Sequence, residues 1–304
     1  MSVSRVDTST PPVVTVVEPR VELHPITTAD LPAVAQFLNE ELNPRVPVDR
    51  WASEIVPTWI VEQPNHGFLL RCDGAVVGAH LALYSEREID GVTQRFCNLA
   101  GWCVAQPYRS HALSLLRALL RQKSYHFTDL SPTPDVMALN TRLGFVTIDT
   151  STVAVPNLPW PVRPRGVRVH STRRRIVKSL HGHDLSVYRD HAGAAAAQHV
   201  VIVRGGEACH VIFRRVRRKK LDLPLFATLV YVSDPDLFRA CSARFFRHLL
   251  LRYGIPATVI ESHVVAGRFP RSREVSPNPK MYRSGSLRPD QIDYLYSELT
   301  NMRW

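Results

Sequence analysis

The sequence predicts an α/β (α+β) protein built from two similar units, each a mixed, largely antiparallel sheet flanked by helices. Its 304 residues are enough for two domains, and apolar residues make up 45% of them. Four prolines lie between Pro156 and Pro164, a density that no helix or central strand tolerates. On both sides of this segment the chain repeats the order hairpin, strand, helix, strand.

The first unit shows clear start and turn signals. Thr27 and Asp30 form a capping box at the start of a helix. The pair Asp73-Gly74 between two apolar runs predicts a hairpin. The other predicted elements are strands at 20–23, 93–104 and 125–130, a helix to about 123, and a second helix before a strand that ends at 148.

The second unit repeats this order with a hairpin at 199–213, a strand at 223–232, a helix at 235–253 and a strand at 258–261. Gly74 precedes Phe127 by 53 positions, and Gly206 precedes Thr258 by 52. This spacing predicts a duplicated unit. A closing helix is predicted within 289–299.

These patterns predict four segments along the chain. They are a flexible tail at 1–19, a first unit at 20–150, an extended proline-rich linker at 151–166, and a basic second unit at 167–304.

Charge is divided unevenly between the two halves. Residues 1–150 hold 12 Lys and Arg against 16 Asp and Glu, whereas the rest holds 26 against 11. The second half therefore carries a net charge of +15 and suits an anionic partner, although a solvated basic surface explains the same numbers. Its basic runs at 173–175 and 214–220 fit nucleic acid or a phosphorylated compound, and nucleic acid is not favoured because no stacking aromatics accompany them.

Several classes of protein are excluded by composition. The five cysteines are odd in number and widely spaced, so we expect reduced thiols, with no disulfide framework and no metal site. No apolar run reaches about twenty residues, so we expect no membrane contact. The first residues lack the apolar run of an export signal, which predicts a cytoplasmic protein.

The segment from Val104 to Ser114 carries the most chemistry. A strand ends and a helix begins within a few residues, which predicts several free backbone N–H groups at a helix N-terminus. Such a start binds anions, and Arg109 adds a positive charge at its rim. The spacing predicts a cradle of the size of a pyrophosphate.

This segment resembles the acetyl-CoA motif of the GNAT acyl-CoA N-acyltransferases. Val104, Tyr108 and Arg109 match the motif in type and spacing, and the run 139–145 is similar to the family's second signature. The resemblance covers about residues 20–150 and implies that acetyl-CoA or another acyl-CoA is the co-substrate. Carried over, it places cofactor contacts at Cys103, Val104, Arg109, Ser110, His111, Ala112, Leu113 and Ser114.

The chain departs from the family pattern at catalytic positions. Ser110, Ala112 and Ser114 replace the usual glycines, and Asn140 replaces a tyrosine that often acts as general acid. The strand at 93–104 holds no carboxylate that could serve as general base. The nearest acid–base candidates are Glu86, His126 and Asp129, with Glu88 beside the first of them, and each also suits a surface or structural role.

The matching turn of the second unit carries Asp234 and Asp236, which would repel a pyrophosphate. Only the first unit is therefore expected to bind acyl-CoA. The function predicted is acyl transfer, most simply N-acetylation, to a small acceptor that is phosphorylated or linked to a nucleotide. The alternatives are a catalytically inactive ligand- or partner-binding protein, and a nucleic-acid-binding protein that uses its basic half.

Overall fold

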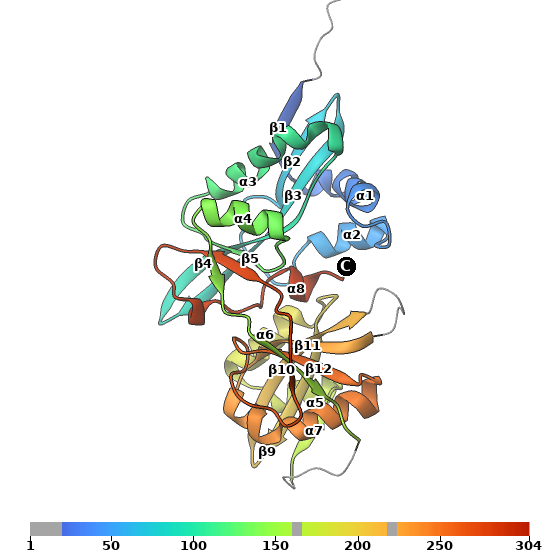
Figure 1. The fold of residues 1–304 in the computed structure, drawn as a ribbon, viewed down its shortest axis with the longest axis vertical. Coiled ribbons are helices and arrows are strands. Elements are labelled where there is room, and N and C mark those ends of the chain that lie inside the picture. Colours follow the sequence, from blue (N-terminus) through green and yellow to red (C-terminus); the bar gives the residue numbers. More distant parts are fainter. Residues whose placement is uncertain (1–19, 160–165, 218–223, 304) are drawn as a thin grey trace, which may run out of the picture.

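Two seven-stranded sheets, one above the other, form the body of the protein in the computed structural model (Figure 1). Residues 20–159, 166–217 and 224–303 are described. The first 19 residues, predicted as a flexible tail, and the end of the basic run at 214–220 lie outside the described residues. The two mixed sheets with flanking helices confirm the predicted fold class.

The first sheet has the strand order β1-β2-β3-β4-β5-β14-β6. Its strands from the first half are β1 Val21–Pro25, β2 Gly67–Cys72, β3 Ala75–Ile89, β4 Val92–Val104, β5 His126–Asp129 and β6 Val146–Ile148. Its helices are α1 Leu31–Glu41, α2 Val48–Ile55, α3 Ala112–Leu120 and α4 Pro134–Arg142, with 3-10 turns η1 Thr28–Asp30 and η2 Gln106–His111.

Local sequence signals account for the placement of these elements. Asp73 and Gly74 both adopt positive φ angles, 50° and 83°, which the tight turn between β2 and β3 requires. The capping box of Thr27 and Asp30 is present at η1, directly before α1. Helix α2 was not predicted.

The second sheet has the order β13-β7-β12-β11-β10-β9-β8. Its strands are β7 Thr152–Pro156, β8 Arg168–His170, β9 Gln198–Arg204, β10 Glu207–Arg217, β11 Pro224–Val232, β12 Ala257–Glu261 and β13 Arg273–Val275. Its helices are α5 Arg173–Ser179, α6 Gly182–His191 and α7 Pro235–Tyr253. Helix α7 has the bounds predicted from the sequence.

The two sheets share the same sense of pairing at their centres. β4 pairs antiparallel with β3 and parallel with β5, as β11 does with β10 and β12. One backbone hydrogen bond also recurs just beyond the central strands. Ala105 N donates to Val77 O, and Ser233 N donates to His210 O, each at 2.9 Å. The centres of the two sheets therefore agree in the order and direction of their strands, and the duplication of the unit stays a prediction.

Two strands lie outside the units to which the sequence boundaries would assign them. β14, Lys280–Arg283, pairs antiparallel with β5 and β6 in the first sheet. β7 pairs antiparallel with β12 and β13 in the second sheet, so the segment at 151–166 begins as a strand and not as a linker. Pro156 is tolerated because it is the last residue of β7. The boundaries drawn at 150 and 167 thus do not separate the strands of the two sheets.

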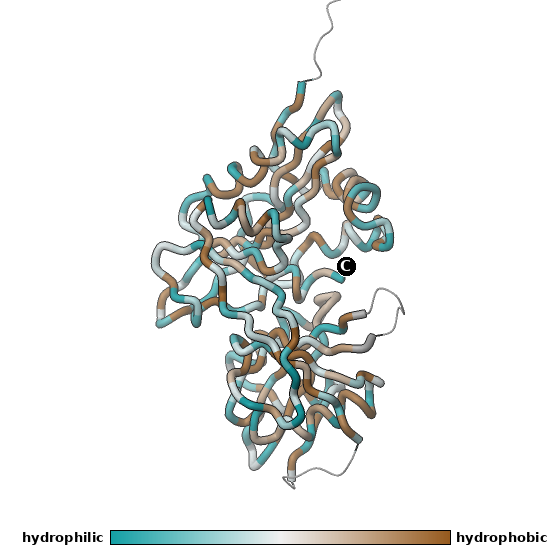
Figure 2. Tube along the Cα trace, in the orientation of Figure 1, coloured by the Kyte–Doolittle hydropathy of each residue, from teal (hydrophilic) through white to brown (hydrophobic). Residues whose placement is uncertain are grey.

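Buried apolar side chains pack on both faces of the sheets. Figure 2 shows brown, hydrophobic stretches of the chain in each half. One cluster joins the units through Phe96 and Leu130 of the first and Val230 of the second, with Tyr282 and Tyr294. Arg87 is buried at this junction, where it donates to Asp293 Oδ1 at 2.9 Å and to Leu295 O at 3.1 Å.

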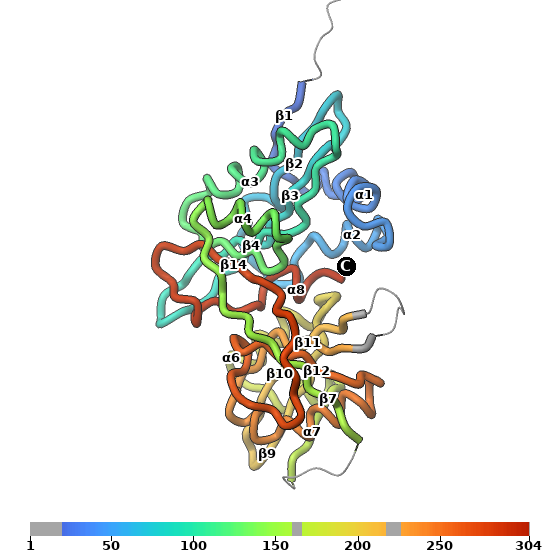
Figure 3. The backbone as a smooth tube through the Cα atoms, in the orientation of Figure 1, coloured from blue at the N-terminus to red at the C-terminus, as the bar shows by residue number. Residues whose placement is uncertain are grey.

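The closing helix predicted within 289–299 is largely absent. A 3-10 turn, η3 Pro289–Gln291, and a short helix, α8 Glu298–Asn301, flank an irregular stretch. Asp293 Oδ1 accepts the N–H of Leu295, and Tyr296 has a φ of +53°, so the backbone leaves the helical path. In Figure 3 the chain runs from the second unit up to β14, and the red segment after β14 runs back to α8 between the units.

The ion pair of Lys280 and Glu261 links the two sheets, because Lys280 lies on β14 and Glu261 lies on β12. Lys280 Nζ lies 2.5 Å from Glu261 Oε1, and the side chains are 4% and 3% exposed. Lys280→Met should lower the free energy of unfolding by about 3–5 kcal/mol, because it leaves a buried carboxylate unpaired. Adding Glu261→Leu should recover most of that loss in urea unfolding.

The exposed pair Arg288–Asp290, with side chains 66% and 68% exposed, provides the matched control. Arg288→Met should change stability by less than about 1 kcal/mol. An equal effect of both single substitutions would contradict the assigned role of the buried pair.

Candidate functional site

The central feature of the first unit is a divergence between β4 and β5. These strands pair in parallel at four positions, from Phe96 with His126 to Leu99 with Asp129. β5 ends there, whereas β4 continues to Val104 against β3 alone. We call the end of this pairing, at Leu99 and Asp129, the vertex. Beyond it, the β4 edge that faces away from β3 has no strand partner within the described part of the chain.

The predicted cofactor cradle lies at the far end of this divergence. Cys103 and Val104 end β4, Arg109, Ser110 and His111 belong to η2, and Ala112, Leu113 and Ser114 begin α3. Arg109, Ser110 and His111 are exposed. The eight predicted residues therefore lie along one continuous segment, from the end of β4 through η2 to the first turn of α3.

Backbone bonding in this turn differs from the expected open loop. Tyr108 N donates to Ala105 O, and Ala112 N donates to Arg109 O, as in a 3-10 helix. The hydroxyl of Ser114 donates back to His111 O at 2.6 Å. Fewer N–H groups are thus free than predicted, because the 3-10 turn uses some of them internally.

The start of α3 nevertheless contrasts with that of α7. Asp234 is the N-cap of α7, where its carboxylate accepts the N–H of Leu237 at 2.9 Å. His111 is the N-cap of α3 and makes no side-chain cap bond. The positive end of α7 is therefore occupied by its own carboxylate, whereas that of α3 is not.

Cys103 lies at the cradle but is not a reactive thiol. Burial raises its pKa to about 11, so the thiolate is scarce at neutral pH.

Of the three acid–base candidates, only Asp129 reaches the vertex. Glu86 pairs with Arg95, and its Oε1 lies 3.0 Å from Arg95 Nε at the surface. His126 shares a 2.9 Å hydrogen bond with Gln94 Oε1, and burial lowers its pKa. Arg95 precedes Val104 by nine residues, or about 30 Å of strand, so Glu86 lies far from the cradle.

Asp129 belongs to a buried polar cluster at the vertex. Burial raises its pKa to about 6, and its Oδ2 accepts the Asn140 amide at 2.9 Å. Asn140 is itself fully buried, and its Oδ1 has no partner among the described atoms. The residue at the position of the family's tyrosine thus faces the vertex, but as an amide.

Three further residues complete this vertex cluster: Asn98, Ser131 and Glu298. The Asn98 amide donates to Thr128 Oγ1 at 3.1 Å, and Asn98 Oδ1 accepts the backbone N–H of Glu298 at 3.0 Å. The Ser131 hydroxyl donates to Glu298 Oε1 at 2.8 Å. Sequence reasoning missed Glu298, because it lies in α8, some 170 residues beyond β5, and no motif marks it.

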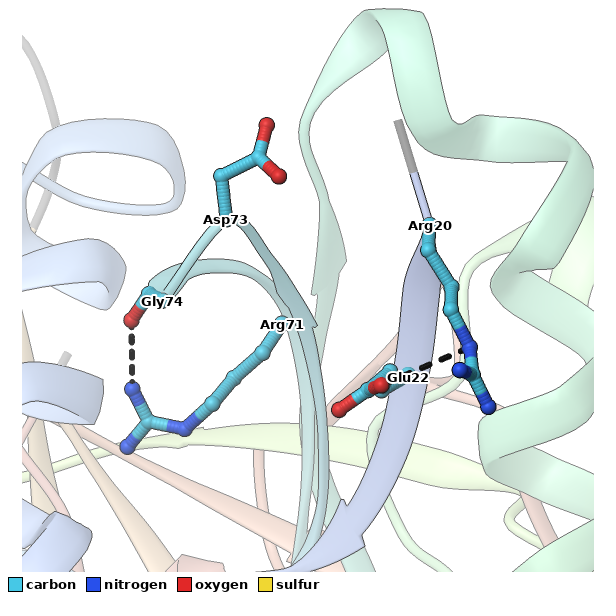
Figure 4. Close-up of a pocket in the computed structure, with 5 residues that line it drawn as sticks. All are labelled: Arg20, Glu22, Arg71, Asp73 and Gly74. Carbon is cyan, nitrogen blue, oxygen red and sulfur yellow. Dashed lines mark hydrogen bonds and ion pairs between the residues drawn. The ribbon is translucent and has the colours of Figure 1, made fainter. Parts of the chain in front are cut away.

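A second feature, shown in Figure 4, is a shallow hollow of about 290 Å³ beside the β2–β3 hairpin. Its cations already have partners: Arg20 lies 3.5 Å from Glu22, and Arg71 donates to Asp30 and to Gly74 O, each at 2.7 Å. The hollow therefore offers an anion little uncompensated charge.

The described residues, 20–159, 166–217 and 224–303, hold neither a metal-binding cluster nor a membrane-spanning helix. No group of three or more His, Cys, Asp or Glu side chains is placed to hold a metal ion. Among the helices of the same ranges, none is both long and apolar enough to cross a membrane.

The raised pKa of Asp129 predicts a pH-dependent effect of Asp129→Asn. The folded protein keeps this proton up to about pH 6, whereas the unfolded chain loses it near 3.8. The carboxyl's contribution to stability is thus complete below 3.8 and is lost as the pH rises through 6. The variant should gain about 2 kcal/mol relative to the wild type between pH 4 and pH 7 in urea unfolding.

The exposed Glu88 supplies the control, since Glu88→Gln should show little change with pH. A pH-independent difference for Asp129→Asn would mean that the carboxyl titrates normally in the folded protein.

No protein-family model matches the sequence, and no curated protein matches it either. Solved structures match the fold. A GCN5-related N-acetyltransferase from Anabaena variabilis has a TM-score of 0.58 at 10% identity, covering 87% of this chain and 72% of that one. A probable N-acyltransferase from Enterococcus faecalis reaches 0.55 at 12% identity, covering 90% and 74%.

A putative acetyltransferase from Pyrococcus horikoshii has a TM-score of 0.52 at 14% identity, and the alignment covers 92% of this chain and 95% of that one. Identities this low speak for the fold alone. The divergent central strands, the helix that follows β4 and the sheet order agree with the resemblance found in the sequence. The chain has the fold of the GCN5-related N-acetyltransferases, the GNAT fold.

Proposed function

We propose that the protein is an acyl-CoA-dependent N-acyltransferase whose reaction takes place in the first unit. The observation that carries the proposal is the divergence of β4 from β5, with the start of α3, which no side chain caps, at its open end. A strand edge without a partner and a helix N-terminus together suit a ligand that is a thioester at one end and a phosphate ester at the other. Acyl-CoA has this form, and we propose that the reaction takes place in the cytoplasm.

The phosphates of acyl-CoA would bind at η2 and the start of α3. Arg109 and His111 are exposed there, and His111 is the N-cap residue. Opening the 3-10 bonds of Tyr108 and Ala112 would release N–H groups for the phosphate oxygens. Ser110 and Ala112, where the family has glycine, are small enough to allow close approach but restrict the backbone more.

The acyl group would then lie along the free edge of β4 between Ala100 and Val104. A backbone N–H of this edge would donate to the thioester carbonyl and stabilise the negative charge that develops on its oxygen. We propose a small anionic acceptor, phosphorylated or linked to a nucleotide. The net charge of +15 after residue 150 supports this choice, because it raises the local concentration of anions.

A second candidate is a GNAT-fold protein that binds a ligand or partner without catalysis. The 3-10 turn at the cradle and the amide of Asn140 in place of a phenol favour it. The segment that contains α8 also packs against the vertex. This candidate predicts ligand binding with no acyl transfer.

Acetyl-CoA should raise the melting temperature of the protein at millimolar concentration, because a ligand that binds only the folded state stabilises it. Ser110→Glu should abolish the shift, since it adds bulk and negative charge where phosphates would lie. Calorimetry with acetyl-CoA measures the same loss directly.

The control is Ser186→Glu, an equal change at an exposed position of α6 in the second unit. It should leave the shift intact. If the wild type shows no shift, or if both variants keep it, the cradle is not a CoA site.

A further inference from the structure

Glu298 occupies an unusual position for a residue of the last helix. It is fully buried, its backbone N–H is bound by Asn98 on β4, and its Oε1 accepts from Ser131 just after β5. Its Oε2 is also buried and has no hydrogen-bond partner among the described atoms. A carboxylate oxygen left without a partner in the interior is costly, so its position calls for an explanation.

The vertex cluster lies on both faces of the first sheet. Cys97, Leu99 and Phe127 pack on the side of α3 and α4, and Asp129 faces the same way with Asn140. Asn98 and Thr128 face the opposite side, where α1 and α2 pack, and Glu298 is bound there. Glu298 and Asp129 therefore flank the vertex from opposite faces.

Two charged groups, Asp129 of β5 in the first sheet and Arg214 of β10 in the second, interact electrostatically with Glu298. Burial raises its pKa to about 7, and the negative charge of Asp129 on β5 adds to this rise. Arg214 of β10 in the second unit is the other, and the negative charge of Glu298 partly offsets the effect of burial on the arginine's pKa. A carboxyl group whose pKa is about 7, as for Glu298, is half ionised at neutral pH, which suits general-base catalysis.

The backbone around Glu298 is held firmly. The Asn301 amide donates to Glu54 O at 2.6 Å and to Val56 O at 3.1 Å, at the end of α2. The backbone N–H of Arg303 donates to Glu54 Oε2 at 2.6 Å, and Met302 is part of the core under α1 and α2. These contacts fix α8 against the first unit, which a positioned catalytic group requires.

We propose that Glu298 is the general base of the first unit, taking the proton from the acceptor amine in the acyl transfer. It supplies the carboxylate that β4 lacks. This inference rests on the proposed function. Because the side chain has no exposed surface, binding of acyl-CoA and the amine must first open the cluster around it.

The step balances without any further reactant. The amine nitrogen attacks the thioester carbonyl carbon, a C–N bond forms, and the proton from nitrogen passes to Glu298 Oε2. The C–S bond breaks and its electron pair leaves with sulfur as the CoA thiolate, which takes a proton from water. Glu298 then loses its proton to solvent.

The test compares wild type with Glu298→Gln in two assays. One measures acetyl-CoA binding by calorimetry, and the other follows CoA thiol release with glucosamine 6-phosphate, phosphoethanolamine and UDP-glucosamine as anionic amine probes. Binding should change by less than threefold, whereas turnover should fall about 100-fold or more. In the wild type, kcat should rise with pH through an inflection near 7. This rising part of the pH profile, the pH limb, should be absent from Glu298→Gln.

Glu54→Gln is the matched control, since Glu54 holds the same segment but does not face the vertex. It should lower stability and keep the pH limb. Asp129→Asn should move the limb to lower pH, because it removes the negative charge that raises the pKa of Glu298. If Glu298→Gln does not fold, that shift still tests the assignment.

The outcomes separate the two proposals. A Glu298→Gln variant that keeps its turnover and its pH limb would overturn the role of Glu298 and leave the proposed function standing. A wild type that binds acetyl-CoA but acylates none of the amines contradicts a base at this position and favours the non-catalytic candidate. A wild type that binds no acetyl-CoA removes both proposals.

Discussion

The parallel pairing of β4 with β5 stops after four positions, and the arrangement of the candidate site follows from where it stops. A sheet normally satisfies its backbone groups strand by strand, so a central strand that outruns its neighbour leaves an edge in the interior. The start of α3 lies at one end of this edge. At the other end, the vertex, the buried carboxyl groups of Asp129 and Glu298 lie on opposite faces of the sheet. A ligand that lies along β4 would complete the hydrogen bonding that the sheet leaves open.

Residues from both halves of the chain meet at this point. Asn98 and Asp129 come from the first half, whereas Glu298 and Arg214 come from the second. The second unit has its own divergence between β11 and β12, but Asp234 occupies the start of α7. The second half of the chain therefore contributes α8 to the first unit, and contacts such as that of Asp293 with Arg87 hold the segment there.

Local signals made most of the fold predictable. The Asp73-Gly74 turn, the Thr27 capping box and the Pro235 helix start depend on neighbouring residues only, and each lies where the sequence places it. The prediction of a closing helix was wrong because Asp293 accepts hydrogen bonds from Arg87 and from the backbone N–H of Leu295. No local sequence pattern reveals the contact with Arg87. In that segment, long-range contacts outweigh the helical periodicity of the sequence.

The site was less predictable for the same reason. The cradle residues form one run of sequence, so a motif could find them. Asp129 was found as a candidate, but its neighbours at the vertex come from β4, α4 and α8, and only the folded chain unites them. His126 and Glu86 looked equivalent to Asp129 in sequence and differ from it because they lie toward the start of β4.

The position of β14 has a consequence for synthesis. Met281 pairs with Asp129, about 150 residues earlier in the chain, so the first sheet cannot be completed until the second unit has been made. During translation β5 and β6 have unpaired edges until β14 is made. Unpaired strand edges are sites of aggregation in incompletely folded chains. Contacts of such long sequence separation also slow folding. The same chain order that delivers Glu298 to the vertex makes the first unit depend on the ribosome finishing the second.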